Sequence, residues 1–130
     1  MTRLLRLAFW TALLFAFVMA ILPQPPHIPG DPSDKMLHVT AFSVLALMAP
    51  LAYRAAPLFR IGLLLSAFGA LIEIVQTVPR LHRDGDWIDW VADTAALAAM
   101  LSLVALARTA HASIRAAAQA KSSADSASQA

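Results

Sequence analysis

Long apolar runs alternate with short polar segments along the chain. Four runs approach the roughly 20 residues that an α-helix needs to cross about 30 Å of hydrocarbon. They cover residues 7–22, 36–53, 61–78 and 88–107. An isolated apolar strand would leave its backbone amides unpaired in lipid, so each run is predicted to be a helix. The pattern predicts an all-α fold, an integral membrane bundle of four transmembrane helices.

The polar segments set the domain boundaries. Residues 23–34, PQPPHIPGDPSD, cannot continue a helix because they are rich in proline. The segments RAAP, residues 54–57, and RLHRDGD, residues 80–86, form the two later connections. Residues 1–108 are therefore predicted to form one transmembrane domain. Residues 109–130 are Ala/Ser-rich and are expected to fray from helix into a disordered cytoplasmic tail.

The first run has a second interpretation. Basic residues, an apolar stretch and VMA, residues 18–20, also resemble a signal peptide with a small-residue cleavage site. The run is longer than a usual signal core and passes directly into prolines, which favours a retained span. Cleavage would leave three spans with the same orientation.

The distribution of Lys and Arg predicts the orientation. Most lie on one side of the four runs: Arg3, Arg6, Arg54, Arg60, Arg108, Arg115 and Lys121. Lys35, Arg80 and Arg83 lie on the other side. Cytoplasmic segments carry the excess of basic residues in membrane proteins. Both termini are therefore predicted to be cytoplasmic, with residues 23–34 and 80–86 facing outward.

Composition excludes several protein classes. Hydrophobic residues make up 59% of the 130 residues and charged residues only 14%, outside the range of a soluble domain. There is no cysteine, which excludes disulfides and thiolate metal sites. The basic residues flank apolar runs and form no stripe with interleaved aromatics, so no nucleic acid partner is predicted. Glycine-rich phosphate loops and serine nucleophile elbows are also missing from the sequence.

Polar residues inside the spans gather in the outward half. A carboxylate in hydrocarbon costs about 2.5 to 3.5 kcal/mol, so several in one small protein need partners or water. We predict a hydrated ligand-binding pocket with Glu73 at its floor, in which Arg83 could hold two carboxylates together, such as Asp34 and Asp89. The predicted pocket residues are Asp34, Lys35, His38, Glu73, Gln76, Arg83, Asp86, Asp89 and Asp93.

Helical spacing indicates which way these side chains face. The third run carries small and polar residues at steps of three and four: Gly62, Ser66, Gly69, Glu73 and Gln76. Small residues let helices approach closely in lipid, so this stripe should face the bundle. The fourth run has a comparable stripe: Asp89, Asp93, Ala96 and Met100.

The same residues resemble the VanZ-like family of small bacterial membrane proteins. The resemblance rests on DKMLHVTAF from Asp34, EIVQ from Glu73 and RDGDWIDWVAD from Arg83, and it covers about residues 34–100. Asp93 stands where the family usually has Asn, and Ala96 and Met100 stand where glycines are usual. The resemblance implies a multi-pass protein of the bacterial inner membrane with a cell-envelope role; the founding member is associated with resistance to the antibiotic teicoplanin.

Three functions fit this pattern. The leading hypothesis is that the pocket binds an envelope molecule, such as a lipid-linked glycan precursor or an amphiphilic peptide, beside ordinary membrane lipids. A membrane enzyme could instead use the carboxylates and His38 for acid/base or metal-assisted chemistry. The third function is an accessory protein in which the cluster only specifies helix packing.

The remaining motifs have simpler interpretations. Only His38 is well placed among the histidines and the spacing matches no metal signature, so no metal or cofactor is predicted and no catalytic residue is assigned. Trp87 and Trp90 are typical of an interfacial anchor, with head-group binding as the alternative.

Overall fold

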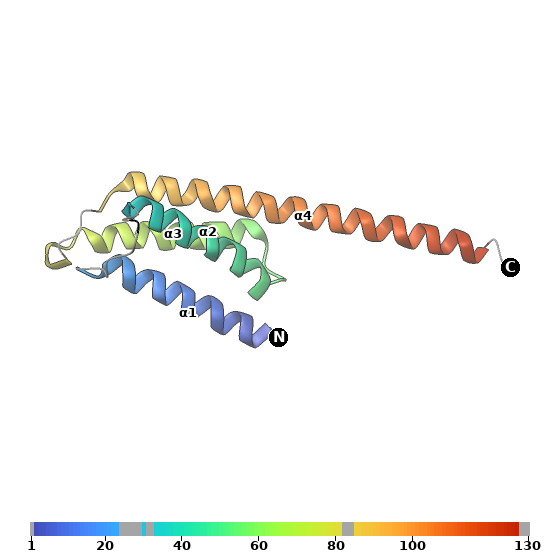
Figure 1. The fold of residues 1–130 in the computed structure, drawn as a ribbon, viewed down its shortest axis with the longest axis horizontal. Helices are drawn as coiled ribbons and strands as arrows, with labels where there is room; N and C mark the ends of the chain where they lie inside the picture. The colour runs from blue at the N-terminus through green and yellow to red at the C-terminus, as the bar shows by residue number, and fades with distance from the viewer. Residues whose placement is uncertain (1, 24–29, 31–32, 82–84, 128–130) are drawn as a thin grey trace.

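The computed structural model describes residues 2–23, 30, 33–81 and 85–127, and its regular structure there is entirely helical (Figure 1). The helices are α1 (Thr2–Ile21), α2 (Asp34–Ala52), α3 (Leu58–Gln76) and α4 (Trp87–Ala127), with a 3-10 turn η1 (Pro79–Leu81). All four α-helices are long and apolar enough to cross a membrane. This confirms the predicted all-α, four-helix architecture and indicates a multi-pass membrane protein.

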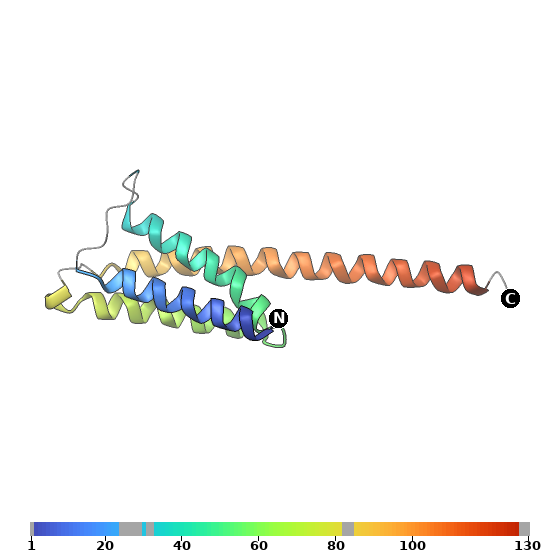
Figure 2. The same cartoon turned by 60° about the horizontal axis from the view of Figure 1, so that its bottom comes forward.

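The helices run alternately up and down, so their connections lie at two opposite ends (Figures 1 and 2). We call the end where α1 and α3 finish and α2 and α4 begin the acidic end. The opposite end, where α2 finishes and α3 begins, is the basic end. The N terminus lies at the basic end, and α4 projects from that end toward the C terminus.

α4 continues as helix through the Ala/Ser-rich segment that is predicted to fray. α4 has 41 residues, which at 1.5 Å per residue make about 60 Å, twice the hydrocarbon thickness. Alanine has the highest helix propensity, and this segment is rich in it. The serine hydroxyls also bond within the helix, as Ser113 does to the Thr109 carbonyl oxygen at 3.1 Å. Local propensity therefore continues the helix through this segment, whose side chains at 109–123 are exposed.

The core is centred on α2, which packs against the other three helices. Its buried face carries Phe42, Leu45 and Ala46, and the facing helices contribute Ile72 and Leu97. Ala46 is fully buried, and small residues of this kind let helix backbones approach closely.

The predicted inward stripe of α3 is confirmed. A Cβ atom at Gly69 would lie 3.2 Å from Cζ of Phe42, and one at Gly62 would lie 3.1 Å from Cδ1 of Leu101. Between them, the hydroxyl oxygens of Ser66 and Thr94 are 2.9 Å apart. Glycine and serine thus allow α3 to contact α2 and α4 closely.

Two arginines satisfy backbone carbonyls where α2 ends. Nε of Arg6 donates to the Ala52 carbonyl at 3.3 Å, and Nη2 of Arg108 donates to the Pro50 carbonyl at 3.3 Å. The last carbonyls of a helix have no partner within it and carry partial negative charge. These arginines therefore have a structural role at the basic end.

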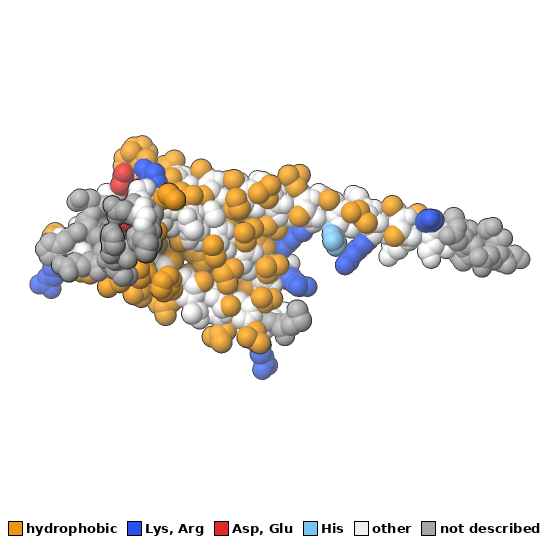
Figure 3. Space-filling model, in the orientation of Figure 1, with side chains coloured by type: hydrophobic (Ala, Val, Ile, Leu, Met, Phe, Trp, Pro, Cys, Tyr) orange, Lys and Arg blue, Asp and Glu red, His pale blue; other side chains and the backbone are white. Residues whose placement is uncertain are grey.

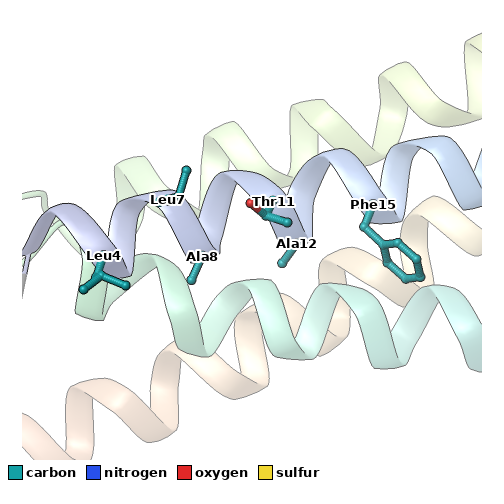
Figure 4. A pocket seen from close by; sticks show the side chains of 6 residues that line it. All are labelled: Leu4, Leu7, Ala8, Thr11, Ala12 and Phe15. Carbon is teal, nitrogen blue, oxygen red and sulfur yellow. The ribbon is translucent and has the colours of Figure 1, made fainter.

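The outer surface of the bundle is apolar. Figure 3 shows hydrophobic side chains along its sides, with Lys and Arg mainly at the basic end and on the projecting part of α4. A shallow groove of about 490 Å³ follows α1 (Figure 4) and is lined by Leu4, Leu7, Ala8, Thr11, Ala12 and Phe15. This groove begins near the N terminus and carries no titratable group.

Candidate functional site

A buried polar cluster lies at the acidic end, where three helices meet around His38. Nδ1 of His38 lies 3.1 Å from Oδ2 of Asp93 and 3.8 Å from Oε1 of Glu73. His38 is 6% exposed, Glu73 8% and Asp93 1%. We call these three residues the histidine cluster. Helices α2, α3 and α4 each contribute one member, so the cluster depends on the packed bundle.

The start of α4 is attached to Glu73. The backbone N–H of Asp86 donates to Oε2 of Glu73 at 2.8 Å. Oδ1 of Asp86 accepts from the Ile88 N–H at 2.9 Å, which satisfies a free donor at the beginning of α4. Asp86 thus acts through its backbone on the histidine cluster, while its side chain caps the helix.

Gly85 makes this attachment possible. A Cβ atom at Gly85 would lie 2.6 Å from the backbone carbonyl oxygen of Glu73 and 3.0 Å from Cγ2 of Thr77. Neither the carbonyl nor the helix that carries it can move aside easily. Only glycine therefore lets residues 85–86 lie directly on the end of α3.

We expect Gly85→Ala to destabilise the protein by about 1–3 kcal/mol, the range for overpacking a close contact. The added methyl group displaces the Asp86 N–H from Glu73 and leaves a buried carboxylate oxygen without its donor. Thermal unfolding in detergent measures the loss. Gly62→Ala is the matched control, because its methyl group meets a flexible Leu101 side chain at 3.1 Å instead of backbone. Equal melting temperatures for the two variants would contradict the proposed contact.

Lys35 and Asp89 form an ion pair beside the histidine cluster. Nζ of Lys35 lies 3.1 Å from Oδ1 of Asp89, and the side chains are 46% and 14% exposed. The contact is a close ion pair between a half-exposed ammonium and a largely buried carboxylate. Asp34 is exposed at the start of α2. Arg83, which is predicted to bridge Asp34 and Asp89, lies outside the described residues; among those described, Lys35 pairs with Asp89.

Gln76 lies away from this pair and connects α3 to α1. Its Nε2 donates to the Ala20 carbonyl at 2.9 Å, and the side chain is buried. A carbonyl in the last turn of α1 thereby gains a donor. The structure therefore gives Gln76 a helix-packing contact, whereas the other buried members of the predicted pocket surround His38.

Trp90 has a packing contact that sequence reasoning missed. Its Nε1 lies 3.1 Å from the Ser66 carbonyl oxygen and 3.2 Å from the Ser66 hydroxyl. The indole thus joins α4 to α3, next to the Ser66–Thr94 contact. Trp87 is 70% exposed at the start of α4, the position expected of an interfacial anchor.

Several buried polar atoms at this end have no hydrogen-bond partner among the described residues. They are His38 Nε2, Glu73 Oε1, Asp89 Oδ1 and Asp93 Oδ1. Buried polar groups are nearly always paired, because leaving one unpaired costs about 1–3 kcal/mol. Within the described ranges, no three His, Asp or Glu side chains are arranged to hold a metal ion. The cluster is therefore suited to proton exchange or to binding a hydrogen-bonding group.

In comparisons with known proteins, no family model, no curated protein and no solved structure matches this chain.

Proposed function

We propose that this chain is a VanZ-like protein of the bacterial inner membrane, whose acidic end faces outward and binds the head group of a lipid-linked or amphiphilic envelope molecule. The observation that carries the proposal is the histidine cluster. Three ionisable side chains from three helices are buried together with unpartnered polar atoms, in a bundle whose other buried residues are almost entirely apolar. Ionisable groups in membrane-spanning helices generally mark functional sites, because apolar residues would pack at lower cost.

The position of the cluster supports a head-group ligand. His38 lies one turn inside α2, and Glu73 lies one turn before the end of α3. In a helix that spans a bilayer, residues one turn from the helix end lie near the level of the lipid head groups. The excess of Lys and Arg at the opposite end supports an outward orientation for the acidic end.

One observation favours an enzyme as the second candidate. When Asp93 is ionised and His38 is neutral, the His38 Nδ1–H donates to the carboxylate, which leaves Nε2 as a buried base without a hydrogen-bond partner among the described residues. A carboxylate that orients an imidazole in this way is a common arrangement in general base catalysis. Loss of function in His38→Gln with ligand binding retained would favour this alternative.

We expect Glu73→Gln and Asp89→Asn to insert and melt like wild type but to fail to complement the envelope phenotype of a deletion strain, glycopeptide sensitivity included. Each substitution keeps the side-chain shape and removes the negative charge. Ser102→Ala is the control, since Ser102 is exposed and bonds only within α4, to the Ala98 carbonyl at 2.7 Å. Full complementation by both variants would remove the case for a binding site. Failure of both to fold would support a role in helix packing alone.

A further inference from the structure

We infer that the head group bound at the acidic end is cationic, an ammonium or guanidinium group and not a phosphate. This inference rests on the proposed function and specifies the chemistry of its ligand. It follows from three features: the kind of polar atom left unpartnered, the charge of this end, and the position of Lys35.

Among the described residues, most buried polar atoms without a hydrogen bond are carboxylate oxygens. They are Oε1 of Glu73, Oδ1 of Asp93 and Oδ1 of Asp89, which has the ion pair with Lys35. The fourth, His38 Nε2, is an acceptor when the neutral ring carries its proton on Nδ1 and donates it to an ionised Asp93. His38 and Asp93 are both more than nine-tenths buried. A ligand that pairs with these atoms must therefore supply several donors, as an ammonium supplies three and a guanidinium five.

The charge of this end favours the same ligand. Among the described residues of this end, five are acidic and two are basic. The acidic residues are Asp34, Glu73, Asp86, Asp89 and Asp93, and the basic residues are Lys35 and Arg80. A phosphate would enter a region of like charge, which opposes binding.

Lys35 shows where an ammonium group fits. Its Nζ lies 3.1 Å from Asp89 Oδ1, and its side chain is 46% exposed on the rim of the cluster. The ammonium of this pair is half-exposed to solvent, so an incoming cation can displace the lysine from Asp89. Lys35 therefore acts as an internal counter-ion at the entrance to the site.

The test uses two amphiphiles with the same tail, dodecylammonium and dodecyl phosphate, and the full chain in a neutral detergent. Isothermal titration calorimetry and thermal shift measure binding, and dodecyl maltoside is the uncharged reference. We expect dodecylammonium to bind at least about tenfold more tightly than dodecyl phosphate, the ratio that one charge-assisted contact provides. Asp89→Asn and Glu73→Gln should each weaken dodecylammonium binding about tenfold. Lys35→Met should strengthen it, because it removes the competing ammonium.

Two outcomes would overturn the inference. In the first, dodecyl phosphate binds more tightly than dodecylammonium, and Lys35→Met abolishes this binding. That result would assign an anionic ligand to the same site; it contradicts the inference and leaves the proposed function intact. Binding of both amphiphiles that no variant changes would contradict the inference and the proposed function together. Lys35→Arg, which keeps the positive charge, should leave the preference for dodecylammonium unchanged.

Discussion

Among substitutions at the acidic end that preserve side-chain volume, His38→Leu is expected to be the most destabilising. We expect it to lower the free energy of unfolding by about 3–5 kcal/mol. His38 lies between two carboxylates, 3.1 Å from Asp93 and 3.8 Å from Glu73. Leucine fills a similar volume but leaves the buried Asp93 without the imidazole donor, and Glu73 with only the Asp86 N–H. Unfolding by denaturing detergent, followed by circular dichroism, measures the loss.

The second substitution distinguishes electrostatics from packing. Replacing a buried ionic pair by apolar residues is often neutral or stabilising. His38→Leu combined with Asp93→Leu should therefore recover much of the stability that His38→Leu loses. Thr40→Leu is the control on the same helix, because Thr40 is exposed and bonds only to the Met36 carbonyl. Neutral hydrogen bonds in membranes contribute on average only about 0.6 kcal/mol. If His38→Leu lowered the free energy of unfolding by less than about 1 kcal/mol, the His38–Asp93 contact would be a neutral hydrogen bond and not an ionic pair.

The four helices could be predicted from sequence because lipid imposes a simple requirement on length and hydropathy. The inward stripe of α3 was also predictable, since small and polar residues at helical spacing have one face available to them. The C-terminal end of α4 could not be predicted in this way. Hydropathy marks where a helix leaves the membrane, near Ala107, whereas alanine propensity continues the helix to Ala127.

The members of the histidine cluster were predictable, but their pairing was not. Spacing along α4 placed Asp93 on an inward face. It gave no information on helix rotation, which decides that His38 meets Asp93 while Lys35 meets Asp89. Gly85 lies in a segment predicted only as a connection. Its contact with the α3 backbone depends on tertiary structure, and no local pattern reports it.

The orientation of the acidic end underlies both proposals, and it predicts an all-or-none labelling result. The chain has no cysteine, so a single introduced thiol reports one position. Lys35 lies at the acidic end and is half-exposed, while Arg60 is exposed near the start of α3 at the basic end. The excess of Lys and Arg at the basic end predicts that position 35 faces outward and position 60 faces the cytoplasm.

The most direct measurement is therefore labelling of Lys35→Cys and Arg60→Cys by a membrane-impermeant maleimide, in intact cells and after permeabilisation. We expect Lys35→Cys to react in intact cells, and Arg60→Cys to react only after the membrane is opened. Wild type, which has no thiol, provides the background. Reaction of Arg60→Cys in intact cells, with Lys35→Cys protected until permeabilisation, would place the acidic end in the cytoplasm and contradict an outward-facing binding site.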